Sequence, residues 1–394
     1  MKKAINHRIM RSNNKRQIVE LLRKNETLTK REIAQQLGVS ITTVATFITE
    51  LIDENRISPS GNAVSTGGRK SELYHLNPDS LYVIGVDLQV DRLITLLINL
   101  RGQILGIQEV KYTGTDEWQI ASTLYQTLLR LCDSTRTPFS KIAGIGVGVP
   151  GIVNHQTGII EFAPNLGWKN VNLAPLLPAD LPVMVENEAN AAAIGESSFG
   201  TAQGRANMIY ISVGRGIGTG LILKNDLYYG HNFVAGEFGH MTIVPNGLPC
   251  RCGKKGCWEV YASNSAALNL YQHYSNKTLD SYDDLLTAFF QSDPIATRVI
   301  NETTDYLGLG IANLINGLNP EMVIIGGKIA EAEEFIQYRT LKEIKEHCFE
   351  YSYRNVEIKF SHLKNKATAL GVGSLMIDYI LDTQINKSSI RERS

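Results

Sequence analysis

The sequence predicts an α/β protein in two parts: a winged helix-turn-helix domain over residues 1–80, then a larger domain of two lobes, residues 81–190 and 191–394. In the first part, apolar residues recur at helical spacing in three short segments, followed by two strand-like runs around a glycine-rich tip. From residue 81 on, apolar strands alternate with helical segments, as is typical of an α/β domain. A chain of 394 residues with 43% hydrophobic content is long enough for such an organisation.

The three helical segments of the N-terminal part are defined by their apolar residues. These are Ile18, Leu21 and Leu22; then Ile33, Ala34 and Leu37; then Ile41, Val44, Ile48 and Leu51. Gly38 is expected to end the second helix, and Ser40 to cap the third. Two helices joined by such a short turn form the helix-turn-helix pattern.

The outward face of the third helix and the glycine-rich tip carry the predicted DNA contacts. Threonine hydroxyls on that face can reach phosphates or base edges, and their methyl groups can touch thymine. Arg69 lies at the tip of the predicted wing, where it could enter a minor groove. The predicted set is Ser40, Thr42, Thr43, Thr46, Arg69 and Lys70. A helical bundle whose hairpin touches only protein is the alternative.

The first 80 residues are basic, although the whole chain has no net charge. They carry 13 Lys and Arg against 8 Asp and Glu, whereas the whole chain carries 39 of each. The excess favours a polyanion such as operator DNA as a partner, although a solvated basic surface would show the same charge. Because one winged helix reads one half-site, we expect a homodimer or a higher homo-oligomer on an inverted repeat.

Two similar strand–turn–strand units organise the larger part. They are "YVIGVDLQVDRLITLLINLRGQIL" from residue 82 and "NMIYISVGRGIGTGLILKNDLYYG" from residue 207. Their recurrence predicts a duplicated architecture with a cleft between the two lobes. The last helix, which contains "ATALGVGSLMIDYI", is expected to return to the first lobe.

A cluster of metal-binding residue types lies within "GHMTIVPNGLPCRCGKKGCWE", residues 239–259. His240, Cys250, Cys252 and Cys257 offer one imidazole and three thiolates, a closed tetrahedral set with no position left for a reactive water. We therefore expect structural zinc rather than catalytic zinc. The position inside an α/β domain argues against a nucleic-acid finger, and thiols without metal are the remaining alternative.

Five segments, in order along the chain, resemble the ROK family (repressor, ORF, kinase). They are "ENEANAAAIGE", "ISVGRGIGTGLI", "GEFGHM", "CRCGKKGCWE" and "INGLNPEMVIIGGKI". The resemblance implies a two-lobed, actin-like ATPase domain of the ribonuclease H-like class, with a sugar bound in the cleft near the metal. With a helix-turn-helix in front, the chain is similar to the sugar-responsive repressor branch, and Glu188 of "ENEAN" is most like the xylose repressors.

The resemblance also implies the sugar contacts. They are Asn187, Glu188, Glu237 and Glu259, with Asn165 of "APNLGW" as a weaker fifth. Metal binding would brace two of the carboxylates, because Glu237 and Glu259 lie within three residues of a predicted ligand. Carboxylates accept hydrogen bonds from vicinal hydroxyl groups, which an uncharged sugar offers. Each residue alone could instead be a helix cap or a surface ion pair.

The first hairpin departs from the kinases of this family. Those kinases carry an acidic residue followed by Gly-Gly-Thr-Lys or a close variant, whose backbone N–H groups cradle phosphate. This chain has "DLQVDRL", in which Asp87 remains but Asp91 would place a negative charge beside an incoming phosphate. Glu188 stands where the kinases have an aspartate base. Poor ATP binding is therefore expected.

These observations together predict a sugar-responsive transcriptional regulator, a repressor by its family branch, that is not an enzyme. It would bind operator DNA, a monosaccharide effector such as xylose and structural zinc. The second hypothesis is a ROK sugar kinase, and the third is a sugar-binding protein that does not bind DNA. No apolar run reaches the ~18–20 residues of a membrane span and the N-terminus lacks a signal-peptide centre, so we expect a cytoplasmic location and no membrane partner.

Overall fold

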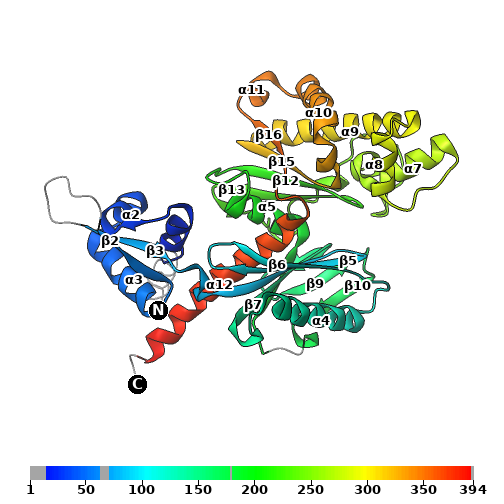
Figure 1. Ribbon diagram of the computed structural model, residues 1–394. Helices are drawn as coiled ribbons and strands as arrows, with labels where there is room; N and C mark the ends of the chain where they lie inside the picture. Colours follow the sequence, from blue (N-terminus) through cyan, green and yellow to red (C-terminus); the bar gives the residue numbers. More distant parts are fainter. Residues whose placement is uncertain (1–14, 63–70, 178–179, 392–394) are drawn as a thin grey trace.

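The computed structural model describes residues 15–62, 71–177 and 180–391, which form a small helical domain and two α/β lobes (Figure 1). The helical domain lies to one side of the first lobe, and a long C-terminal helix runs between them (Figure 1). Within the described ranges, no helix combines the length and the hydropathy that a membrane span requires.

The N-terminal domain contains the predicted helix-turn-helix. A helix over residues 15–24 is followed by β1 (Leu28–Thr29), α2 (Lys30–Leu37), α3 (Ile41–Asp53), β2 (Ile57–Asn62) and β3 (Glu72–Leu76). Thr29 and Glu32 form a capping box at the start of α2, and Gly38 ends this helix with a left-handed φ of 64°. Ser40 caps α3 by accepting a hydrogen bond from the Thr43 N–H at 3.1 Å. The three helices and the roles of Gly38 and Ser40 are confirmed.

Ile41 differs from the sequence-based expectation. It was placed on the buried face of the third helix, but it is 52% exposed. As the first residue of α3 it precedes the face that packs, and Phe47, which is 6% exposed, completes the core instead. The predicted wing residues Arg69 and Lys70 lie outside the described residues, between β2 and β3.

The first lobe is built on a five-stranded sheet of order β11-β7-β4-β5-β6. Its strands are β4 (Tyr82–Leu88), β5 (Arg92–Asn99), β6 (Ile104–Lys111), β7 (Ile142–Val149) and β11 (Val183–Asn187). A smaller sheet contains β8 (Ile152–Asn154), β9 (Ile159–Ala163) and β10 (Trp168–Asn172). Helix α4 (Glu117–Thr135) packs on one face of the large sheet, and Leu97 points to it, whereas Leu96 and Ile98 point to the opposite face.

The second lobe repeats this plan with a sheet of order β14-β13-β12-β15-β16. Its strands are β12 (Met208–Val213), β13 (Ile217–Leu223), β14 (Asp226–Leu227), β15 (Met322–Gly327) and β16 (Glu357–Phe360). Its helices are α6 (Glu259–Ala262), α7 (Asn264–Ser275), α8 (Tyr282–Phe290), α9 (Pro294–Leu318), α10 (Glu333–His347) and α11 (Glu350–Tyr353). Two similar sheets thus confirm the duplicated α/β architecture.

Helices α5 (Glu188–Phe199) and α12 (Ala367–Arg391) connect the parts of the molecule. They cross closely: a Cβ on Gly371 would lie 1.7 Å from the Ala191 carbonyl oxygen. Helix α12 also packs on β4 and β7 of the first lobe. Farther along, Ile377 and Ile380 of α12 share one hydrophobic cluster with Ile18 of the N-terminal domain. Figure 1 shows α12 running from the region between the lobes to this domain.

We expect Gly371→Ala to destabilise the protein by about 1–3 kcal/mol or more, because the new methyl group must displace the backbone of α5. Chemical denaturation measures the loss. Gly317→Ala is the matched control, since Gly317 lies within α9 and a Cβ there meets nothing within 4 Å. That change should stabilise by about 0.5–1 kcal/mol, through helix propensity. Equal stabilities of the two variants would contradict the close crossing of α5 and α12.

Candidate functional site

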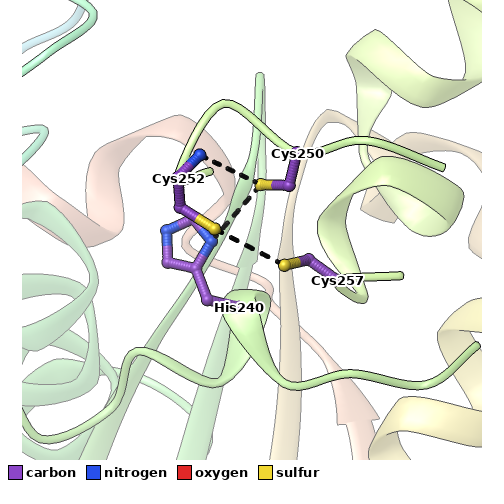
Figure 2. A group of neighbouring side chains, drawn as sticks. All are labelled: His240, Cys250, Cys252 and Cys257. Atoms are coloured by element: carbon purple, nitrogen blue, oxygen red, sulfur yellow. Dashed lines mark hydrogen bonds between the residues drawn. The ribbon is translucent and has the colours of Figure 1, made fainter. Parts of the chain in front are cut away.

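The four predicted metal ligands lie together in the second lobe. His240 comes from the short helix η4 (Phe238–His240), and the three cysteines come from the loop that leads into α6 (Figure 2). Their ligand atoms all lie within 4.8 Å of one another. The sulfur atoms of Cys252 and Cys257 are 3.6 Å apart, and Cys250 Sγ is 3.7 Å from His240 Nδ1. The corners of a tetrahedron of Zn–S bonds lie about 3.8 Å apart, so this donor set fits zinc.

The loop that carries the cysteines is held in shape by its backbone. Cys250 N–H donates to the Lys254 carbonyl at 2.8 Å, and Thr242 pairs with Cys257 in an isolated bridge. Gly256 permits this pairing, because it has a φ of 77° and a Cβ there would lie 1.8 Å from the Val244 carbonyl oxygen. Local backbone hydrogen bonds therefore help to place the three sulfur atoms in this loop.

Two predicted sugar-binding carboxylates flank the metal ligands. Glu259 Oε1 lies 3.4 Å from His240 Nδ1, and Glu237 Oε2 lies 3.9 Å from His240 Nε2. Glu259 begins α6, two residues after Cys257, and Glu237 is the cap of η4. Burial raises the pKa of Glu237; His240 opposes the shift and Glu259 adds to it. Glu237, His240 and Cys252 also line an open hollow on this face of the lobe.

The first lobe contributes Glu188, the first residue of α5. Burial raises the pKa of Glu188 to about 8, and the negative charges of Asp87 and Glu237 add to the shift. Asp87, at the end of β4, is 4% exposed, and burial raises its pKa to about 7. Carboxyl groups of the two lobes are therefore near enough for the charge of Glu237 to affect the pKa of Glu188.

Asp87 was absent from the predicted sugar set. Its signal in the sequence was the acidic residue of "DLQVDRL" at the end of a strand, which was assigned to phosphate chemistry. Glu186, buried immediately before the "NEAN" segment, and Tyr229, whose hydroxyl donates to it at 2.9 Å, were also missed. No local pattern in the sequence joins these two positions.

The predicted amides are placed differently. Asn187 caps α5: its side-chain oxygen accepts from the N–H groups of Ala189 and Asn190 at 2.9 and 3.1 Å, and its Nδ2 donates to the Gly151 carbonyl at 2.8 Å. One amide hydrogen of Asn187 is left for a ligand. Asn165 is half-buried in the turn between β9 and β10, and in the described chain no hydrogen bond joins it to the other four predicted sugar contacts.

The predicted DNA-binding helix presents its threonines outward. Thr42 and Thr46 are exposed, and Thr43 is partly exposed. The Thr46 hydroxyl donates to the Thr42 carbonyl at 3.2 Å, which leaves its oxygen lone pairs facing outward. A phosphate oxygen accepts hydrogen bonds, so a contact with a phosphate would require such a hydroxyl to turn away from its carbonyl partner.

Two family models match the chain: the ROK family over residues 83–379, and a winged helix-turn-helix DNA-binding model over residues 11–58. The xylose repressor of Bacillus subtilis is 32% identical over 373 residues, which are 94% of this chain and 96% of that protein. A solved ROK family transcriptional regulator, a homolog of the E. coli MLC protein, has a TM-score of 0.81 and 25% identity, and the match covers 95% of this chain and 98% of that one.

A solved ROK family glucokinase from Streptomyces griseus, in complex with glucose and AMPPNP, matches with a TM-score of 0.68 and 30% identity. That match covers 98% of the glucokinase but 75% of this chain. The repressor and the regulator match across almost the whole chain, whereas the kinase leaves a quarter of it unmatched. The chain therefore belongs to the ROK family and carries a winged helix-turn-helix DNA-binding domain in front of its ROK domain.

Proposed function

We propose that this protein is a sugar-responsive transcriptional repressor of carbohydrate-utilisation genes. It binds operator DNA through its N-terminal domain and a monosaccharide, with xylose as the first choice, between its lobes. The observation that carries the proposal is that Glu237, beside the metal ligand His240, lies near enough to Glu188 of the other lobe to affect its pKa, in a chain that also carries a winged helix-turn-helix. The choice of xylose follows from the relative named a xylose repressor.

The proposed sugar contacts are Asn165, Asn187, Glu188, Glu237 and Glu259. Three of them are carboxylates, which accept hydrogen bonds from hydroxyl groups, and Asn187 has one amide hydrogen to donate. The proposed metal is zinc, held by His240 and the three cysteines, and its role is structural because four protein ligands fill its coordination. Cys250 Sγ lies on the side of His240 Nδ1, and the opposite ring nitrogen, Nε2, lies 3.9 Å from Glu237.

The first hairpin supports a role without phosphoryl transfer. At its tip, Gln89 N–H donates to the Arg92 carbonyl at 2.9 Å, and Gln89 Nε2 donates to Asp87 at 2.7 Å. The Tyr112 hydroxyl donates to the Gln89 carbonyl, and the Tyr112 N–H donates to the Asp91 carbonyl. The polar groups of the turn are thus hydrogen-bonded within the protein. The Gln89 donors are therefore used within the turn and do not bind a phosphate. The exposed Asp91 carboxylate would repel a phosphate.

A path for the sugar signal runs along α12. Near its start, the Thr368 hydroxyl donates to the Glu188 carbonyl at 3.3 Å. Near the middle of α12, Asp378 interacts with the charge of Arg23 on the first helix, and burial raises the pKa of Asp378 to about 7 against the effect of this guanidinium. A ligand shifts an equilibrium only by its differential affinity for two states, so a tenfold change in operator affinity needs about 1.4 kcal/mol of coupling.

The test measures operator affinity and phosphate release with the same preparation. Binding to the DNA upstream of the gene is titrated with and without D-xylose, D-glucose and other monosaccharides, and phosphate release is followed with ATP and each sugar. A sugar-dependent change in operator affinity without phosphate release is expected. Sugar phosphorylation at ordinary enzyme rates, about 1–100 per second, would establish the kinase instead. Sugar binding without operator binding would establish a sugar-binding protein that does not act on DNA.

We further propose a homodimer or a higher homo-oligomer on an inverted repeat, because one winged helix reads one half-site, and a cytoplasmic location, where the operator DNA would lie. Arg69→Ala is expected to weaken operator binding roughly tenfold, within the range of about 1–3 kcal/mol for a residue that enters a groove. Fluorescence anisotropy with labelled operator measures the change. Arg251→Ala is the control, because this exposed arginine lies in the second lobe. An Arg69 variant that binds like wild type would mean that the wing contacts only protein.

A further inference from the structure

The segment that follows β14 reaches from the second lobe to the first. Tyr229 and Phe233 lie on it, and their rings pack on His155, in the turn between β8 and β9 of the first lobe. The ring centroids of His155 and Tyr229 are 4.0 Å apart, and those of His155 and Phe233 are 4.7 Å apart. Phe233 has a φ of 63°, which bulky residues rarely adopt, so its packing must hold it there.

Tyr229 also makes a polar contact between the lobes. Its hydroxyl donates to Glu186 Oε2 at 2.9 Å. Glu186 is 3% exposed, and its other carboxylate oxygen accepts from Asn187 N–H at 2.8 Å and from Asn190 Nδ2 at 3.1 Å. The Glu186 carboxylate therefore accepts a hydrogen bond from Tyr229 of the second lobe. In the first lobe it accepts from Asn187 and Asn190, which precede and follow Glu188 in the chain.

The same segment anchors Glu237. Its loop is closed by a hydrogen bond from Ala235 N–H to the Tyr229 carbonyl at 3.1 Å. The Gly236 carbonyl accepts a hydrogen bond from the Thr219 hydroxyl. The two backbones lie close together, since a Cβ on Gly236 would lie 2.3 Å from the Thr219 carbonyl oxygen. Glu237, the next residue, is thus tied both to β13 and to the loop of Tyr229. Movement of Tyr229 relative to Glu186 would change the distance between Glu237 and Glu188.

We infer that Tyr229 is a positioning residue for the sugar site: its hydrogen bond to Glu186 holds Glu188 of one lobe and Glu237 of the other at the separation that a monosaccharide spans. The inference rests on the proposed function, since it needs a sugar between these carboxylates. Tyr229 acts through Glu186 and does not touch the sugar. Without the bond, the open cleft gains population, and a sugar must spend part of its binding energy on closing it.

The test compares Tyr229→Phe, which removes the hydroxyl and keeps the stacked ring, with Tyr228→Phe, a neighbouring and 49% exposed tyrosine. We expect Tyr229→Phe to raise the dissociation constant of D-xylose, or of D-glucose if that is the sugar bound, about tenfold. Zinc content, sugar-free operator affinity and operator affinity at saturating sugar should match wild type. Tyr228→Phe should bind sugar within about twofold of wild type. Amide hydrogen exchange without sugar should be faster at residues 187–190 in Tyr229→Phe alone.

Each other outcome has a definite meaning. If wild type and Tyr229→Phe bind the sugar equally and exchange equally at residues 187–190, the inference is overturned and the proposed function stands. If Tyr229→Phe also loses zinc or sugar-free operator binding, Tyr229 has a general structural role and the inference is again overturned. If wild type binds none of the monosaccharides titrated in the test of the proposed function, that function itself fails and the inference falls with it.

Discussion

Replacing Cys252 by serine is expected to remove the zinc and the sugar response together. The wild-type chain should hold about one zinc, because its four donors form one closed set. Loss of one thiolate leaves three ligands, and metal affinity and local structure are lost together when a site is built from a loop. Glu237 and Glu259 flank His240 at 3.9 and 3.4 Å, so both carboxylates lose their support with the metal.

Zinc content by elemental analysis and sugar binding by calorimetry measure this effect in the purified protein. Cys348→Ser is the matched control, since Cys348 is half-buried at the end of α10, outside the metal cluster. The control should keep its zinc and its sugar affinity. Operator binding without sugar should survive in Cys252→Ser, because the described residues of the N-terminal domain share a hydrophobic cluster with α12 that includes no residue of this loop. A zinc-free preparation that binds sugar at full strength would refute the bracing role of the metal.

The helix-turn-helix could be predicted because its signals are local. Gly38 and Ser40 act on backbone groups within four residues, and both caps are present in the structure. The metal cluster could also be predicted, since three of its four ligands lie within eight residues, from Cys250 to Cys257. Ile41 was misplaced because helical periodicity alone does not show where the packed face of a helix begins.

The parts that could not be predicted depend on contacts between distant residues. Tyr229 and Glu186 are 43 positions apart, and their hydrogen bond exists because two lobes of separate sheets meet there. The grouping of Asp87 with Glu188 has the same origin, since β4 and α5 come together only in the folded first lobe. Asn187 shows a different limit. From the sequence alone, a residue between a strand and a helix is equally consistent with a helix cap and with a ligand contact. In the structure, its side-chain oxygen caps α5.

The protonation of Glu188 leads to the second large effect, a sugar affinity that rises with pH. Burial and the charges of Asp87 and Glu237 raise the pKa of Glu188 from 4.5 to about 8, so the sugar-free protein holds this carboxyl protonated at pH 7. A sugar hydroxyl that donates to Glu188 favours the ionised form, which means that binding releases a proton. Below the raised pKa this release works against binding, so affinity should increase by up to about tenfold per pH unit and level off above pH 8.

Glu188→Gln cannot ionise, so it should lose the rise in affinity near pH 8 while keeping sugar-free operator affinity. At pH 8.5 it should bind sugar more weakly than wild type by about 1.5–3 kcal/mol, the usual value of a hydrogen bond to a charged group. At pH 6 the two proteins should differ much less, since glutamine resembles the protonated carboxyl group. Calorimetry from pH 6 to 8.5 measures the profile, with Glu161→Gln, an exposed change on β9, as the control. Parallel profiles for wild type and Glu188→Gln would mean that Glu188 does not accept a hydrogen bond from the sugar, and the site between the lobes would have to be placed elsewhere.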